Sequence, residues 1–241
     1  KNCFFAAFKG DSVDGHDFAS QAIKSGAEFV LASKNISEPH ILVSDVQHAL
    51  TSLAIYNRSK LSDIKVIAIT GSQGKTTTKD FAAHLIGMLG NTVAPVASLN
   101  NELGVPLLIL QCDEKTNFCI VEMGARHKGD ISHLCKIAQP EIGVVLVVGS
   151  AHLGEFGSRE KIAETKKELI DSLPDSGCAI LGDYDEFTSK MADGRKIKKI
   201  VFGTNSVCDV RAADIELREG RPTFDLVTEA GRASVTLQFL G

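Results

Sequence analysis

Residues 66–79, which read VIAITGSQGKTTTK, decide how the rest of the chain is interpreted. The β-branched apolar run 66–70 predicts a buried strand, and the segment from Lys75 onward predicts a helix. Between them Gly71 and Gly74 bracket a tight turn in which backbone N–H groups can approach an anion closely. Because a new helix also directs its positive end at such an anion, the stretch predicts a phosphate-binding loop.

Two side chains of the loop suit a nucleotide bound with its metal ion. Lys75 supplies a positive charge for the phosphates, and Thr76 offers a hydroxyl to a phosphate-bound magnesium. Only two residues separate the glycines, where the general P-loop has four, so an ordinary glycine turn is the alternative interpretation. We predict phosphate contacts from six loop residues, namely Gly71, Ser72, Gly74, Lys75, Thr76 and Thr77.

The composition predicts a soluble protein that does not bind nucleic acid. The 241 residues are 44% hydrophobic, enough for one or two cores, and no apolar segment is long enough for stable membrane insertion. A net charge of -4 with mixed signs offers no basic surface to nucleic acid. The six cysteines form no CxxC pair, so we expect reduced, structural thiols and a cytoplasmic location.

Both ends of the sequence lead us to expect a piece of a longer protein. The chain opens at Lys1 without a methionine or a signal peptide and enters an apolar stretch directly. It stops at Gly241, where an expected strand finishes.

Hydrophobic patterning predicts two α/β units, 1–61 and 62–241. Asp14 and His16 in the first unit form either a ligand loop or an ordinary polar turn. From residue 62 strands and helices alternate, which predicts an α/β fold with a mostly parallel sheet flanked by helices. The first unit is expected to hold strands at 3–8, 29–32 and 41–43 and helices at 18–25 and 45–59. The second is expected to hold strands at 66–70, 92–96, 118–122, 143–148, 179–181 and 200–202, then a β-meander at 210–215, 223–227 and 233–239.

Polar residues follow three of the strands in the second unit, at the sheet edge where ligands bind in such folds. Glu122 ends one strand, and a carboxylate beside a phosphate loop suits magnesium, although a solvated strand end is the plainer alternative. Asn100 and Asn101 follow another strand and either contact a ligand or close a turn. His152 lies in a glycine-rich loop, as a metal or phosphate contact or as a surface histidine.

Lys166 lies in the middle of the apolar stripe of a helix predicted at 158–173. One interpretation is that its stem packs on the core while its amine reaches solvent. The other is that the amine serves a metal–phosphate site or is modified to change its charge. Helical geometry alone does not decide between them.

Five segments resemble the Mur ligase family of peptidoglycan synthesis, and within it the branch that adds D-alanyl-D-alanine to UDP-N-acetylmuramoyl tripeptide. They are ITGSQGKTTTK (69–79), LNNELGVP (99–106), EMGARHKGDI (122–131), VGSAHLGEFGS (148–158) and ETKKEL (164–169). The phosphate loop of the family has the short GxxGK[ST] form, which accounts for the spacing of Gly71 and Gly74. The resemblance covers almost the whole chain and implies part of a UDP-sugar-binding domain followed by the central ATP-binding domain.

The resemblance implies a role for each candidate residue. Lys75 and the loop backbone would hold the ATP phosphates, Thr76 and Glu122 one Mg²⁺, and His152 a second Mg²⁺. Lys166 matches the lysine that is carbamylated in the family to serve the second Mg²⁺, so Lys75, His152 and Lys166 are the implied catalytic residues. The implied substrate-binding residues are Asn100 and Asn101, near the peptide, and Asp14 and His16, in the UDP-sugar domain.

The implied reaction is ATP-dependent amide formation by a monomer. The γ-phosphoryl group of ATP passes to the tripeptide carboxylate, and the amine of D-alanyl-D-alanine attacks the acyl phosphate, which leaves ADP and phosphate. Family members continue past the equivalent of Gly241 into a Rossmann-like domain to which nothing here corresponds, so we hypothesise a formed phosphate loop without ligase activity. Two alternatives stay open, a folylpolyglutamate synthetase-like ligase of the same superfamily and a nucleotide-binding switch.

Overall fold

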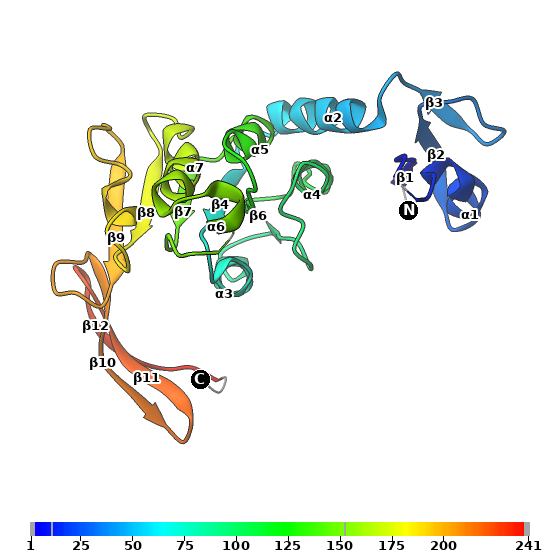
Figure 1. The fold of residues 1–241 in the computed structure, drawn as a ribbon. Coiled ribbons are helices and arrows are strands. Elements are labelled where there is room, and N and C mark those ends of the chain that lie inside the picture. Colours follow the sequence, from blue (N-terminus) through cyan, green and yellow to red (C-terminus); the bar gives the residue numbers. More distant parts are fainter. Residues whose placement is uncertain (1–2, 11, 152, 239–241) are drawn as a thin grey trace.

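The computed structural model describes residues 3–10, 12–151 and 153–238, which form two β-sheets connected by a long helix (Figure 1). The small sheet lies at one end of the molecule, and α2 (Val46–Lys60) runs from it to the larger sheet. A β-meander extends from the opposite side of the larger sheet (Figure 1). The helix therefore bridges two separate cores.

The small sheet joins β1 (Cys3–Ala6), β2 (Ala27–Ala32) and β3 (His40–Leu42) in parallel. Between the first two strands lie η1 (Gly15–Phe18) and α1 (Ala19–Lys24). The predicted strands and helix of this unit are confirmed, although β1 ends two residues before the expected end at residue 8. Its core holds Ala7, Ala19, Val30 and Ala32.

Helix α2 begins after Asp45, whose side chain accepts a hydrogen bond from the His48 N–H. Leu53, which the periodic pattern places on the buried face, is 42% exposed. The buried residues recur every four positions, and the first three of them lie on the face that the pattern predicts, namely Val46, Leu50, Ala54 and Arg58.

The buried Arg58 attaches the end of α2 to the larger sheet. Its guanidinium donates hydrogen bonds to the carbonyls of Leu61, Ala138 and Gln139. It also pairs with Glu141 at 2.9 Å. Since these partners satisfy the buried charge, an arginine is tolerated on the inner face. The domain boundary near Leu61 stays a prediction.

The larger sheet has the strand order β12-β11-β10-β9-β8-β7-β4-β6-β5. The pairs from β5 to β10 are parallel, and only β10–β11 and β11–β12 are antiparallel. This confirms the mostly parallel sheet and the meander at its edge. The strands are β4 (Lys65–Thr70), β5 (Thr92–Val93), β6 (Phe118–Glu122), β7 (Ile142–Val145), β8 (Cys178–Gly182), β9 (Lys198–Gly203), β10 (Val210–Arg218), β11 (Arg221–Thr228) and β12 (Gly231–Thr236).

Helices cover both faces of the central strands. On one face α2 packs with α4 (Gly104–Ile109), α5 (Asp130–Ala138) and α7 (Arg159–Asp171) over the main core. On the other face α3 (Lys75–Gly87) packs Ala82, Ala83 and Ile86 against strand residues that include Ile67, Ile69 and Ile120. Figure 1 shows α3 on the opposite side of the sheet from α5 and α7. The short helix α6 (Leu153–Phe156) directly precedes α7 in the chain.

Two of the parallel strands predicted for the larger sheet end early. The strand predicted at 92–96 stops at Val93, because Pro95 has no N–H for a ladder and its carbonyl is bound by Lys79. The strand predicted at 143–148 stops at Val145, and the residues after it bond to the phosphate loop, with the Ser72 N–H donating to the Val147 carbonyl. The predicted strand 233–239 is β12, and Phe239 lies outside the described residues.

Two bulk features agree with the sequence. All six cysteines are free thiols, four of them buried. Of the helices in the described part of the chain, none has both the length and the apolar composition of a transmembrane span.

Candidate nucleotide and metal site

The phosphate loop joins the carboxyl end of β4 to the first turn of α3. Thr70 closes the strand by donating its hydroxyl to the Met123 carbonyl at 2.9 Å. Gly74 caps α3 with a φ of 80°, a left-handed conformation that favours glycine. A Cβ added at Gly71 would lie 2.9 Å from the Cβ of Leu146, the residue after β7, so the loop packs too closely on this segment for a larger residue. Both predicted glycines are therefore required by the backbone.

Lys75 folds back over the loop that it follows. Its Nζ donates to the Gly71 carbonyl at 2.9 Å. The ammonium consequently lies beside the start of the loop, where the helix dipole also favours an anion.

Glu122 accepts hydrogen bonds from three side chains on two neighbouring segments. The Thr76 hydroxyl donates to its Oε2 at 3.0 Å. The Ser98 hydroxyl and the Asn100 amide donate to its Oε1 at 3.0 Å and 2.8 Å. The register Ile69↔Glu122 between β4 and β6 sets this carboxylate beside the phosphate loop. The sheet thus brings together residues that lie far apart in the sequence.

The surroundings of Glu122 fit a divalent cation. The residue is only 1% exposed, and all three donors are neutral. Among the described residues no lysine, arginine or histidine forms an ion pair with it. A buried carboxylate is costly without an opposite charge, and hard cations take carboxylate and hydroxyl oxygens. Thr76 and Glu122 supply both kinds of oxygen side by side.

The two adjacent asparagines have different partners. Asn100 reaches Glu122, and its carbonyl accepts the Gly124 N–H at 2.8 Å. The Asn101 side-chain oxygen accepts the N–H groups of Leu103 at 3.3 Å and Gly104 at 2.9 Å, at the start of α4. Asn101 therefore closes a turn, while its substrate contact stays a prediction.

Lys166 lies on the buried stripe of α7, which is capped at Ser158 as the sequence predicts. Its side chain is 7% exposed, so the interpretation with the amine in open solvent does not hold. Burial, reinforced by the charge of Lys75, lowers the pKa of Lys166 from 10.5 to about 8. The surroundings of this amine therefore disfavour its charged form.

A cavity of about 710 Å³ lies beside the phosphate loop and is lined by Gly71 of that loop. Lys75 and Lys166 line it with Asn100 and with Arg126 from the segment that follows β6. Its lining holds the cations Lys75, Arg126 and Lys166 and the carboxylates Glu102 and Asp130, and this small excess of positive charge suits an anionic ligand larger than a phosphate group.

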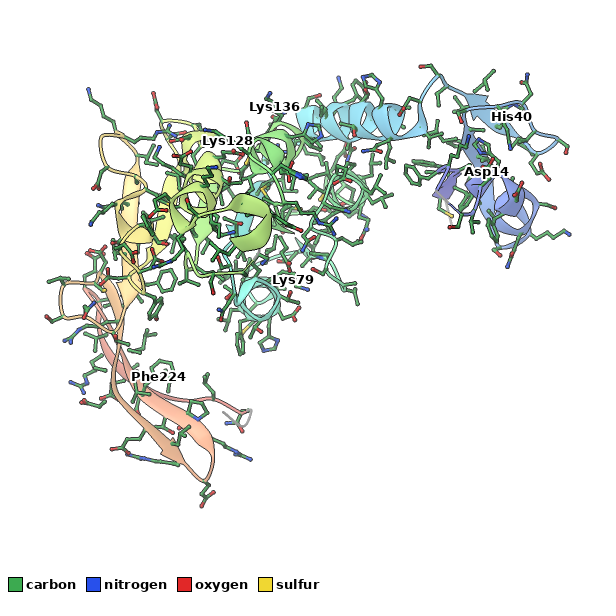
Figure 2. The ribbon with its side chains drawn as sticks, in the orientation of Figure 1. Asp14, His40, Lys79, Lys128, Lys136 and Phe224 are labelled. Atoms are coloured by element: carbon green, nitrogen blue, oxygen red, sulfur yellow. The ribbon has the colours of Figure 1, made fainter. Side chains whose placement is uncertain are left out.

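Asp14 and His16 lie in the small unit, far from the loop; Figure 2 shows Asp14 well separated from Lys79 of α3. The His16 Nε2 accepts the Ser33 N–H at 3.0 Å, so its Nδ1 carries the proton toward Asp14 at 2.6 Å. Lys34 pairs with the other Asp14 oxygen at 2.7 Å. The described contacts are those of a closed polar turn, and the role of Asp14 and His16 toward UDP-sugar stays a prediction. His152 lies outside the described residues.

Comparison with known sequences places the chain in a family. The Mur ligase middle domain matches residues 69–241, and the catalytic domain of the Mur ligase family matches residues 1–58. The chain belongs to the Mur ligase family. The family assignment and the α/β fold expected from the five segments are thereby confirmed.

Relatives narrow the branch of Mur ligases to which this chain is similar. A UDP-N-acetylmuramoyl-tripeptide--D-alanyl-D-alanine ligase of Mycobacterium tuberculosis is 40% identical, across 98% of this chain and 51% of its own length. A structure of MurF from Acinetobacter baumannii is 35% identical with a TM-score of 0.87, across 99% of this chain and 53% of that one. MurF of Thermotoga maritima in complex with ADP is 33% identical with a TM-score of 0.83, across 98% and 55%. The chain spans about half the length of the curated relatives it matches.

Two residues of this Mur ligase chain were missed by sequence reasoning. Ser98 donates to Glu122, and its only signal was its position two residues before Asn100 at the same sheet edge. Lys79 is fully buried on α3. Its signal was the spacing 79, 82, 83 and 86, which places a lysine on the inner stripe of the helix.

Proposed function

We propose that this chain is the nucleotide-binding part of an ATP-dependent amide ligase that joins D-alanyl-D-alanine to UDP-N-acetylmuramoyl tripeptide. The observation that carries the proposal is the contact of Thr76 with the buried Glu122 beside the phosphate loop. Lys75 and Lys166 line the same cavity. The substrates follow from the names of the relatives, which match 98% and 99% of the chain.

The phosphate loop orients ATP in this proposal. Backbone N–H groups between Gly71 and Gly74 and the amino end of α3 bind the phosphates, and Lys75 leaves the Gly71 carbonyl to contact them. A magnesium ion held by the oxygens of Thr76 and Glu122 would neutralise phosphate charge during transfer. The role of this pair rests on residue chemistry, since both are hard oxygen ligands.

The reaction needs an activated carbonyl, because a free carboxylate is a poor electrophile. A carboxylate oxygen of the tripeptide attacks the γ-phosphorus, the bond to the β-phosphate oxygen breaks, and ADP leaves. The amine of D-alanyl-D-alanine then attacks the carbonyl carbon of the acyl phosphate, phosphate departs, and the ammonium proton is lost. Lys75 and Lys166 supply positive charge near the transferred group, or Lys166 acts as its carbamate after reaction of its neutral amine with CO₂.

The nucleotide part of the proposal is tested by calorimetric titration of the chain with ADP, with and without Mg²⁺. We expect Mg²⁺ to tighten binding in the wild type and not in Glu122→Gln. ADP affinity that is the same with and without Mg²⁺ in the wild type would overturn the assignment of Thr76 and Glu122.

The ligase part is tested by phosphate release from ATP. Since the chain spans about half the length of its relatives, we expect no acceptor-dependent release from the chain alone. Release that requires both UDP-N-acetylmuramoyl tripeptide and D-alanyl-D-alanine, with the amide product seen by mass spectrometry, would show that this chain carries the ligase activity by itself. Release that is equally fast without either acceptor would favour a nucleotide switch instead. Lys136→Met, an exposed lysine on α5, is the control and should match the wild type.

A further inference from the structure

Lys79 is a lysine in an unusual place. It lies on the stripe of α3 that faces the sheet, together with Ala82, Ala83 and Ile86, and it is 0% exposed. Its ammonium donates to the Pro95 carbonyl at 2.6 Å and pairs with Asp80 at 2.7 Å. Figure 2 shows the residue on α3, at the edge of the central core.

An apolar side chain would serve packing at position 79 better than a lysine. Moving an ammonium out of water costs several kcal/mol, and buried ion pairs often add no net stability over apolar residues of similar volume. Asp80 is 67% exposed, so it keeps its hydration whether or not Lys79 is present. The bond that only a donor at position 79 can make is the one to Pro95.

Pro95 lies near the start of segment 94–101, whose side chains donate hydrogen bonds to Glu122. The strand β5 ends at Val93, and the segment 94–101 then carries Ser98 and Asn100, which both donate to the carboxylate. Its far end is fixed where Asn101 caps α4. Pro95 is buried and has no N–H, so its carbonyl is its one backbone hydrogen-bonding group.

The hydrogen bonds of Thr76, Glu122, Asn100 and Lys79 form a chain of contacts that begins and ends on α3. Thr76 and Lys79 lie three residues apart and so on neighbouring positions of the α3 surface. Thr76 donates to Glu122, Glu122 accepts from Asn100, and the segment of Asn100 returns through Pro95 to Lys79. The helix that carries the predicted metal ligand Thr76 thus also holds the segment that orients the predicted ligand Glu122.

We propose that Lys79 is a positioning residue that fixes segment 94–101 so that Ser98 and Asn100 orient Glu122 for the metal. The inference rests on the proposed function for the metal itself, whereas the position of the segment does not depend on it. Without the bond to Pro95 the segment moves away from β6, Oε1 of Glu122 loses its donors, and the carboxylate no longer keeps one oxygen beside Thr76.

The first test measures the segment without any ligand. The Gly124 N–H donates to the Asn100 carbonyl at 2.8 Å, whereas the neighbouring Met123 N–H donates to Ile69 in β4 at 2.8 Å. In Lys79→Met we expect amide hydrogen exchange, followed by NMR, to accelerate about tenfold at Gly124 relative to Met123. A folded Lys79→Met in which the two amides keep their wild-type ratio would overturn the proposal. Lys136→Met is the matched control on an exposed lysine.

The second test measures the metal. Residues that orient a metal ligand typically contribute 10–100-fold to affinity, so we expect Lys79→Met to reduce the Mg²⁺-dependent gain in ADP affinity about tenfold. The ADP affinity of Lys79→Met without Mg²⁺ should stay within about twofold of the wild-type value. A general loss of structure would instead reduce ADP affinity both with and without Mg²⁺. Asn100→Ala should give a similar reduction, and the double variant should add about twofold or less to it. Fully additive effects would show that Lys79 does not act through Asn100, and would overturn the proposal.

The two tests separate failure of the inference from failure of the proposed function. If the wild type shows no Mg²⁺-dependent gain, the proposed function fails, and the exchange ratio still decides whether Lys79 holds the segment. If Lys79→Met does not fold, Lys79→Gln takes its place, because glutamine is neutral and too short to keep the 2.6 Å contact with Pro95. An unchanged exchange ratio in that variant would equally overturn the proposal.

Discussion

The larger sheet and the small unit each hold a carboxylate surrounded by hydrogen-bond donors, Glu122 and Asp14. The donors of the two carboxylates differ in charge. Asp14 accepts from the His16 N–H and ring and pairs with the cation of Lys34. Glu122 accepts only from neutral hydroxyl and amide groups and is almost fully buried. The first carboxylate has its counter-charge within the protein, whereas the second has no cationic partner among the described residues and suits a cation from solution.

Lys34 in the small unit and Lys166 at the cavity differ in the direction of their pKa shifts. The hydrogen bond with Asp14 raises the pKa of Lys34. Burial and the charge of Lys75 lower the pKa of Lys166 to about 8. The turn in the small unit is therefore electrostatically satisfied, and the cavity holds positive charge that an anionic ligand would neutralise.

The largest expected effect concerns Lys166 and pH. Its pKa is depressed in the folded chain, so the unfolded chain binds more protons between pH 8 and 10.5, and stability should rise with pH across that window. A difference of 2.5 pKa units corresponds to about 3 kcal/mol, taken as an order of magnitude. Lys166→Met should remove this rise and be more stable than the wild type at pH 7. Urea unfolding at pH 7 and pH 10 checks it, and a wild type with equal stability at both values would contradict the burial of a charged amine.

The next effect concerns Glu122. Glu122→Gln keeps the shape and the bonds to Asn100 and Ser98 but removes the charge, so the Mg²⁺-dependent gain in ADP affinity should fall about 100-fold. The melting temperature without metal should not fall, because a buried uncompensated charge is removed. Calorimetry and circular dichroism measure the two quantities. A variant that is strongly destabilised and still gains affinity from Mg²⁺ would show that Glu122 is structural.

Sequence patterns predicted well the helices, strands and caps that depend on neighbouring residues. They predicted poorly the contacts between residues far apart in the chain. Helix α7 and the inward Lys166 follow from the Ser158 cap and from helical period, which are local. The proximity of Glu122 to the loop follows from the parallel topology. By contrast, the burial of Arg58 depends on the Ala138 carbonyl 80 residues away, and Lys79 binds the Pro95 carbonyl 16 residues away. No pattern within a single segment contains those contacts.

Asn100 and Asn101 are adjacent, but only Asn100 contacts Glu122, so the pair separates the effect on the carboxylate from the effect on the backbone. Asn101→Ala should cost about 1 kcal/mol of stability, because its side-chain oxygen accepts the N–H groups of Leu103 and Gly104 at the start of α4. Its effect on Mg²⁺-dependent ADP binding should be within about twofold, in contrast to the tenfold expected for Asn100→Ala. Urea unfolding and calorimetry on both variants make the comparison. Equal losses of metal-dependent affinity would mean that the segment acts as one body.

The smallest effect is expected at Asp14. Lys34, then the backbone and ring of His16, hold the pKa of Asp14 well below its usual value of 3.8. A depressed carboxyl pKa contributes stability above pH 3.8 that is lost as the pH falls below it, so Asp14→Asn should weaken the small unit slightly at pH 7 and reduce its sensitivity to acid. Amide exchange at Ser33, which donates to His16, should increase modestly. ADP binding should not change, because the turn and the phosphate loop belong to different cores; a change in nucleotide affinity in Asp14→Asn would show that the turn and the loop are coupled through α2.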